Sequence, residues 1–272
     1  MTSEVASTDP PPPSRALSWA RFLGALVVVS LGAAAFAAAF RGLLSLVFRR
    51  ALHATDVVSA FEHLPWALRL ALPPLGGALA GLVALATVRA AQGHGVGDVM
   101  EAVVFGRSRL SLRVTLLKSL GSWFAIVTGG SIGREGPLIQ FGGVLGDTVS
   151  EALRLDERRS RTLMAAGTAA GFAAAYNTPL AAVLFVLEVV TGIAALDTVL
   201  ATIAATAFAT AATRFVVGGG PIYGARAFEM VGTAALAAYA ALGLVAALVA
   251  QWFMRMLAGG EALFTRSRLP QQ

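Results

Sequence analysis

The sequence predicts an all-α polytopic membrane protein with broken or re-entrant helices, and three observations support this fold class. Of the 272 residues, 57% are hydrophobic and only 13% are charged, whereas a soluble globular domain carries roughly 25% charged residues. Long uncharged stretches alternate with short charged connections, as in chains that cross a bilayer several times. Glycine and proline interrupt some of these stretches. Most of the surface is therefore expected to face lipid.

The charge balance and the absence of cysteine exclude several classes of function. The net charge of +6 comes from 21 Lys and Arg against 15 Asp and Glu, which fits a positive-inside loop bias and not a nucleic-acid surface. Without cysteine, disulfides, thiolate metal sites and cysteine nucleophiles are excluded. No nucleotide loop, metal-ligand cluster or nucleophile arrangement is recognisable, so we expect no enzyme, no metal, no cofactor and no nucleic-acid partner.

Four uncharged stretches predict helices that cross the membrane. A spanning helix needs about 20 apolar residues. Residues 22–40 and 70–88 meet this requirement with a little help from their flanks, and residues 230–254 meet it easily. Residues 198–213 become long enough once their flanking residues are counted. Each of these stretches is expected to form one crossing.

Three further apolar stretches predict shorter helices. The stretch 162–187 contains Asn177, Thr178 and Pro179, and the proline prevents a continuous helix because it lacks an amide donor and restrains the preceding residue. The stretches 119–133 and 136–146 are short and glycine-rich, so we expect helices that end inside the membrane. Backbone groups at such ends need protein or water partners, which indicates a buried polar site.

The composition of the two ends predicts a three-part organisation. Residues 1–15 contain two acidic residues and the proline run 10–13, and this composition predicts a disordered cytoplasmic tail. Residues 16–257 form the transmembrane domain, and residues 258–272 form a polar C-terminal tail. Two groups of arginines indicate candidate cytoplasmic loops, one at 107, 109 and 113 and the other at 154, 158, 159 and 161.

Two glycine-rich loops have the features of an anion site. One covers residues 93–98 and the other residues 133–137, and each precedes a short apolar segment. Pro137 suits the beginning of a helix, where its missing donor costs nothing. A helix N-terminus offers free N–H groups and roughly half a positive elementary charge. At the end of a broken membrane helix, this chemistry is typical of the ion sites of channels and transporters.

The motifs around these loops resemble those of the CLC family of chloride channels and chloride/proton antiporters. They are Gly-Arg-Glu-Gly-Pro at 133–137, the run from Ala169 to Ala181, and Leu184-Phe185 followed by Glu188. The resemblance extends over residues 20–257. It implies the first inverted repeat of that fold and chloride transport. It also implies a multi-pass protein of a bacterial cell (inner) membrane.

The resemblance also implies roles for individual residues. Glu135 matches the family's gating glutamate, whose carboxylate competes with chloride, and Arg134 and Gly136 would supply backbone donors. The first loop resembles the family's Gly-Ser-Gly-Ile-Pro, and His94 stands at the serine position. The implied anion-binding residues are His94, Gly95, Val96, Arg134, Glu135 and Gly136.

Two departures from the family pattern leave alternatives open. Val189 occupies the position of the antiporters' inner proton-transfer glutamate, so the expected behaviour is channel-like and a proton-coupled antiporter is the alternative. No Gly-x-Phe-x-Pro loop of the second half occurs in the chain. We therefore expect a homodimer or a complementary second-half chain, with a truncated, non-conducting subunit or scaffold as the other alternative.

The charged and polar candidates also have structural interpretations. Glu135 would be a helix cap if it has no gating role, although an ionisable residue within apolar membrane sequence is by default functional. Lys118 either raises the potential of an anion path or reaches the membrane interface. Arg134 is expected to pair with a buried carboxylate, for which Glu188 is the candidate. His94 would otherwise be a loop residue at the start of a helix.

Overall fold

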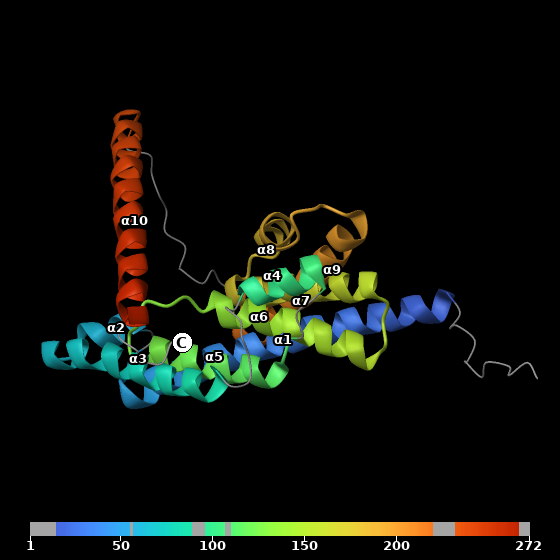
Figure 1. Cartoon of the computed structure of the whole chain (residues 1–272), viewed down its shortest axis with the longest axis horizontal. Helices are drawn as coiled ribbons and strands as arrows, with labels where there is room; N and C mark the ends of the chain where they lie inside the picture. Colours follow the sequence, from blue (N-terminus) through green and yellow to red (C-terminus); the bar gives the residue numbers. More distant parts are fainter. Residues whose placement is uncertain (1–14, 55–56, 89–95, 107–109, 220–231, 267–272) are drawn as a thin grey trace, which may run out of the picture. The chain divides into compact units, whose positions relative to one another are not determined.

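A computed structural model describes residues 15–54, 57–88, 96–106, 110–219 and 232–266. The chain divides into two units, residues 1–222 and residues 223–272, and each is described separately. All the regular elements in the described residues are helices (Figure 1), so the predicted all-α class is confirmed.

Among the described residues, the first unit contains a succession of α-helices with one π-helical turn, and the second contains one long helix. The helices of the first unit are α1 (Arg15–Ala51), α2 (Val57–Glu62), α3 (Trp66–Val88), α4 (Val96–Phe105), α5 (Leu112–Val127), α6 (Glu135–Ala152), α7 (Glu157–Tyr176), α8 (Pro179–Phe185), the π-helix η1 (Val186–Thr191) and α9 (Leu196–Val217). The helix of the second unit is α10 (Ala234–Arg266).

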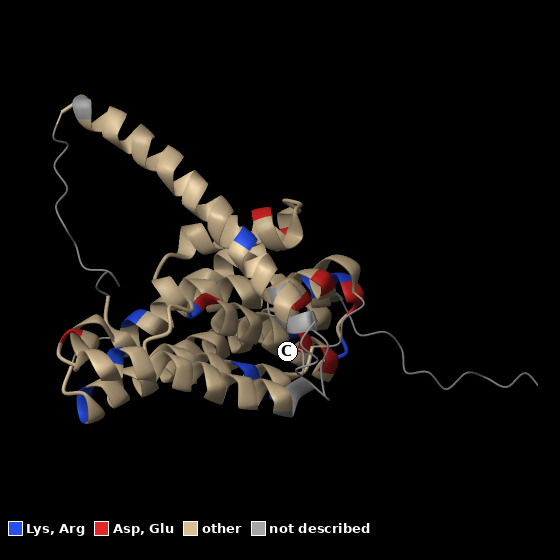
Figure 2. Ribbon diagram, turned by 60° about the vertical axis from the view of Figure 1, so that its left-hand side comes forward, with Lys and Arg blue, Asp and Glu red and all other residues tan. Residues whose placement is uncertain are grey.

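The four predicted crossings correspond to α1, α3, α9 and α10. Within the described residues, four helical segments are long and apolar enough to cross a membrane: Leu17–Ala51, Trp66–Leu85, Leu196–Val217 and Ala235–Gly260. Figure 2 shows that Lys, Arg, Asp and Glu lie mostly towards the helix ends. Residues 1–14 lie outside the described part, and α10 continues through Arg266, well past the predicted domain boundary at 257.

The predicted break within 162–187 is confirmed. Helix α7 ends at Tyr176, and Asn177 adopts the left-handed conformation with φ +57° while its N–H donates to the Ala173 carbonyl at 2.7 Å. Pro179 then begins α8 as its first residue, where a missing N–H is tolerated. The sequence Asn-Thr-Pro thus ends one helix and starts the next within three residues.

The helices at 119–133 and 136–146 are present with different bounds. Helix α5 begins at Leu112 because Ser111 caps it, and α6 continues to Ala152. Each helix extends past a charged residue that was treated as an interruption, whereas residues 128–133, predicted as helical, follow the end of α5. Arg113 and Lys118 lie inside α5, since an exposed or paired charge does not break a helix.

The core of the first unit is built on α1, α6 and α7, which pack side by side (Figure 1). The backbones of α6 and α7 meet at glycines: a Cβ added to Gly142 would overlap the Gly167 carbonyl oxygen, and one added to Gly167 would overlap that of Gly142. A Cβ added to Gly171 would likewise overlap the carbonyl oxygen of Leu138. Small residues allow such close approach of membrane helices, so this contact fixes where α6 begins relative to its neighbours.

Candidate functional site

The loop before α6 starts from a tight helix end. Helix α5 closes with Gly129 at φ +88°, whose N–H donates to the Ile126 carbonyl, while the Gly130 N–H donates to the Ala125 carbonyl at 2.8 Å. This pair of hydrogen bonds forms a Schellman motif, which ends a helix and turns the chain sharply. The chain then runs without regular structure through Arg134 and enters α6 at Glu135.

The Glu135 side chain is half-buried and folds back over the loop. A Cβ placed on Gly133 would overlap Oε2 of Glu135, so only glycine at 133 leaves room for the carboxylate in this position. Glu135 is also the first residue of α6, where a negative charge interacts favourably with the helix dipole. The carboxylate thus lies beside the helix N-terminus, as both its gating and its capping interpretations require.

The first turn of α6 has donor groups available. Arg134 occupies the N-cap position, but its side chain makes no capping hydrogen bond. The first N–H groups of an α-helix have no intrahelical acceptor. A Cβ added to Gly136 would meet no atom within 4 Å, so space is open beside these donors. Pro137 is the third helical residue and not the first, a position where its missing donor still costs no helical bond.

Arg134 does not form the predicted pair with Glu188. Its guanidinium carbon lies 5.8 Å from the centroid of the Tyr176 ring, at the end of α7. Glu188 is exposed on η1, and no ion pair joins these two described residues. The prediction was wrong because it considered only carboxylates as partners of Arg134. A charge within a membrane segment can also be stabilised by an aromatic face.

Lys118 has a carboxylate partner that the sequence analysis missed. Its Nζ lies 3.7 Å from Oδ2 of Asp98, and both side chains are largely buried. Asp98 is in the first turn of α4, so the pair connects α5 to the beginning of that helix. The available signal was the presence of two isolated opposite charges in two apolar segments, because such charges usually pair inside a membrane.

Of the predicted anion-binding residues His94, Gly95 and Val96, only Val96 belongs to the described part of the chain. His94 and Gly95 are outside the described residues, and Val96 is the first residue of α4. One turn further, Val99 packs against Gly143 of α6, at 2.7 Å from the position of an added Cβ. The structure therefore brings α4 against α6 but does not describe the loop that leads to it.

Val189 lies on the π-helix that follows α8 and is 42% exposed. Its neighbours Val186 and Val190 point the other way, into a small core with Val99 and Val103 of α4. The position that we expect to correspond to proton transfer, from the resemblance alone, is thus held by an exposed apolar side chain next to α4.

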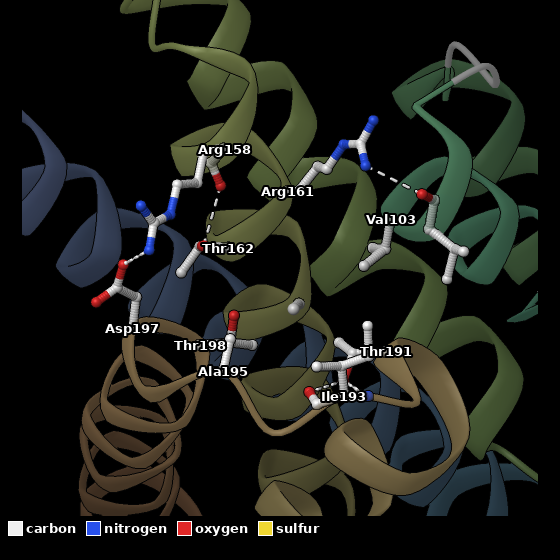
Figure 3. A pocket seen from close by; sticks show the side chains of 11 residues that line it. Val103, Arg158, Arg161, Thr162, Thr191, Ile193, Ala195, Asp197 and Thr198 are labelled. Carbon is white, nitrogen blue, oxygen red and sulfur yellow. Dashed lines mark hydrogen bonds and ion pairs between the residues drawn. The ribbon is translucent and has the colours of Figure 1, made fainter.

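A cavity of about 240 Å³ lies between the end of α4, the beginning of α7 and the segment after η1 (Figure 3). An ion pair of 2.5 Å between Arg158 and Asp197 closes one side, and Arg161 donates to the Val104 carbonyl at 3.0 Å and to Glu157. The lining residues are Val103, Val104, Arg158, Arg161, Thr162, Ala165, Thr191, Ile193, Ala195, Asp197 and Thr198. None of the predicted site residues belongs to this cavity, and sequence analysis gave no sign of it.

Metal chemistry finds no support in the described part of the chain, where no three His, Cys, Asp or Glu side chains cluster as metal ligands. The donors available at the start of α6 are N–H groups and an arginine. This arrangement suits an anion.

Comparisons with known proteins find relatives of this chain. A ClcB-like protein of Ralstonia nicotianae is 34% identical over 79% of this chain and 51% of its own length. The H(+)/Cl(-) exchange transporter ClcA of Cronobacter sakazakii is 35% identical over 54% of this chain and 33% of its own length. This chain spans about half the length of the first of these relatives and a smaller share of the second.

A solved structure and a family model complete the comparison. The crystal structure of a slow cyanobacterial Cl-/H+ antiporter superposes with a TM-score of 0.73 and 25% sequence identity, over 92% of this chain and 59% of that one. The family model described as voltage gated chloride channel matches residues 76–272. The family expected from the Gly-Arg-Glu-Gly-Pro loop is therefore confirmed, and the chain belongs to the voltage gated chloride channel (CLC) family of integral membrane proteins.

Proposed function

We propose that this chain contributes to chloride transport across a bacterial cell membrane through an anion site at the beginning of α6. The observation that carries the proposal is the combination of uncapped first-turn donors with open space beside Gly136. Partial charges of this kind attract a small anion without holding it as tightly as a full cation would. His94 and Gly95, which precede α4 in the chain, and Val96, its first residue, are proposed to contribute as well.

In this proposal Glu135 gates the path. Its carboxylate lies next to the donors that an anion would use, so the ionised side chain competes with chloride for them. Protonation removes the competing charge and opens the path. The direction of the pH effect on flux follows from the charge alone.

The test is chloride efflux from liposomes, compared between the parent chain and Glu135→Gln in an active assembly. We expect the variant to conduct more at neutral pH and to lose its acid dependence, because an amide presents no competing negative charge. Glu188→Gln is the matched control, since Glu188 is exposed on η1, and it should leave rate and pH profile unchanged. An unchanged pH profile in correctly folded Glu135→Gln would reduce Glu135 to a helix cap.

The proposed transport is channel-like because Val189 cannot relay a proton. We expect chloride flux to move few protons, and proton uptake driven by a chloride gradient at equal internal and external pH measures this directly. A fixed proton-to-chloride stoichiometry would favour the antiporter alternative. That alternative is motivated by the similarity to an exchange transporter and to an antiporter.

The pathway is proposed to need a second set of anion ligands from a complementary chain. One set of helix ends leaves part of a dehydrated anion without partners, and that is costly. We therefore expect liposomes that contain only these 272 residues to show little efflux. Robust efflux from that sample would contradict the requirement.

A non-conducting subunit is the second candidate, and one observation favours it. The apolar stretch of α10 has no residue buried within its own unit, which suits association with another membrane protein. A gain of flux in Glu135→Gln distinguishes the two candidates, because a scaffold has no flux to change.

A further inference from the structure

A second cavity lies at the N-terminal ends of α1, α7 and α9. Its volume is about 500 Å³. One wall is apolar and comes from two membrane-spanning helices: Leu23 and Leu26 of α1 face Leu200 and Ala204 of α9. Leu23 and Leu200 are both more than half exposed, so this wall opens sideways, towards lipid. Since a water molecule takes up about 30 Å³ in the liquid, the cavity is far larger than a single small ion needs.

The opposite end of this cavity is charged. Arg158 and Arg159 of α7 lie there with Asp156 and Asp197, so two positive and two negative groups share one mouth. Arg158 contacts Asp197 at 2.5 Å, and Arg159 contacts Asp156 at 3.4 Å. The Arg158 side chain is 80% exposed and Asp197 51%, so both keep free hydrogen-bonding capacity. Figure 3 shows the Arg158–Asp197 pair beside Thr162.

Trp19 marks the level of the membrane interface. Its ring lies 5.2 Å from the guanidinium carbon of Arg159, and it lines the same cavity. Tryptophan is enriched where a membrane helix meets the headgroup region, and Trp19 stands near the beginning of the α1 span. The apolar wall is therefore at the depth of acyl chains, and the charged mouth is at the depth of headgroups.

The charges of the mouth select among lipid headgroups. A guanidinium recognises a phosphate through paired N–H donors, and a carboxylate accepts hydrogen bonds from a primary ammonium. Phosphatidylethanolamine carries both partners. Phosphatidylcholine has the same net charge but no N–H group, and phosphatidylglycerol has no cation to match the two aspartates.

We propose that this groove binds one phosphatidylethanolamine molecule. Its phosphate contacts Arg158 and Arg159, its ammonium contacts Asp156 and Asp197, and one acyl chain lies between α1 and α9. The site is separate from the beginning of α6, and its occupancy does not depend on whether the chain conducts chloride.

The test uses the full chain in nanodiscs that contain phosphatidylethanolamine, phosphatidylcholine or phosphatidylglycerol, each with brominated acyl chains that quench nearby tryptophan. Subtracting the signal of Trp19→Phe isolates Trp19 from the other three tryptophans. We expect half-maximal quenching of Trp19 at an approximately fivefold lower mole fraction of phosphatidylethanolamine than of the other two lipids, because only this headgroup has an ammonium that donates charge-assisted hydrogen bonds to the two aspartates in addition to its phosphate contacts.

The double variant Asp156→Asn, Asp197→Asn should abolish the preference for phosphatidylethanolamine over phosphatidylcholine. Asparagine still caps α7 at position 156, and the ratio of two lipids within one variant does not depend on the folded fraction. Glu157→Gln is the matched control, because Glu157 is on the same helix but does not line the cavity, and it should keep the fivefold preference.

Three results would overturn the proposal. Equal quenching by the three lipids would mean that the groove binds acyl chains without distinguishing between the headgroups. Stronger quenching by phosphatidylglycerol would mean that the arginines dominate. A Trp19 signal that responds to no brominated lipid would mean that protein covers the groove.

Discussion

Helices α7 and α10 contrast in hydrophobicity and burial. Helix α7 begins with charged residues, is rich in alanine and glycine, and buries nearly all of its length after Arg161. Helix α10, the helix described in the second unit, has an apolar stretch of 26 residues and buries none of them within its own unit. In water the more apolar helix would be the buried one. In a membrane, lipid covers apolar side chains as well as protein does, so small side chains and not hydrophobic ones indicate which helix is central.

The glycines of the two helices show the cause of this contrast. Gly167 and Gly171 of α7 each lie so close to a backbone carbonyl of α6 that no Cβ would fit. Gly243, Gly259 and Gly260 of α10 have no atom within 4 Å of an added Cβ. The first set of glycines is required by packing and the second is not.

The largest expected effect comes from filling the α6–α7 contact. Gly167→Leu should lower the free energy of unfolding by about 3 kcal/mol or more, since the backbones have to separate to admit the side chain. Gly243→Leu is the matched control and should change stability by less than about 0.5 kcal/mol. Thermal unfolding in detergent, followed by size-exclusion chromatography, measures both. Equal shifts would break the contrast between the helices.

A smaller effect is expected from the aromatic contact between α1 and α6. Phe36 and Phe141 stack with ring centroids 3.9 Å apart. Phe141→Ala should cost about 2 kcal/mol, because a half-buried ring and its partner contact are lost. Phe253→Ala removes a ring that is 55% exposed on α10 and should leave the melting temperature nearly unchanged. A comparable loss in both variants would show that α10 is packed against protein in the sample.

The smallest effect concerns the beginning of α7. Oδ1 of Asp156 accepts a hydrogen bond from the Arg159 N–H at 3.0 Å. Asp156→Ala should cost about 1 kcal/mol, whereas Asp156→Asn keeps the cap and should be nearly neutral. Chemical denaturation in a mild detergent resolves this difference. If the two variants are equally destabilised, the charge of Asp156 and not its capping bond is what matters.

The predictability of the candidate site differs between its residues. The Gly-Arg-Glu-Gly-Pro loop places Glu135 at a helix start, and the structure has α6 begin there, because glycine and proline act on the local backbone. The partners of Arg134 and Lys118 were not predicted. Tyr176 and Asp98 lie 42 and 20 residues away from them in the chain, and no local pattern connects such positions.

The sequence by itself determined the membrane class, the four long apolar helices, the break at Asn177 to Pro179 and the family, since each depends on composition or on a short run of residues. The tertiary structure decided that α7 is central, that Lys118 pairs with Asp98 and that two cavities meet at Arg158 and Asp197. These features depend on which helix faces meet. Hydrophobicity does not determine that choice in a membrane, because lipid and protein are equally good partners for an apolar side chain.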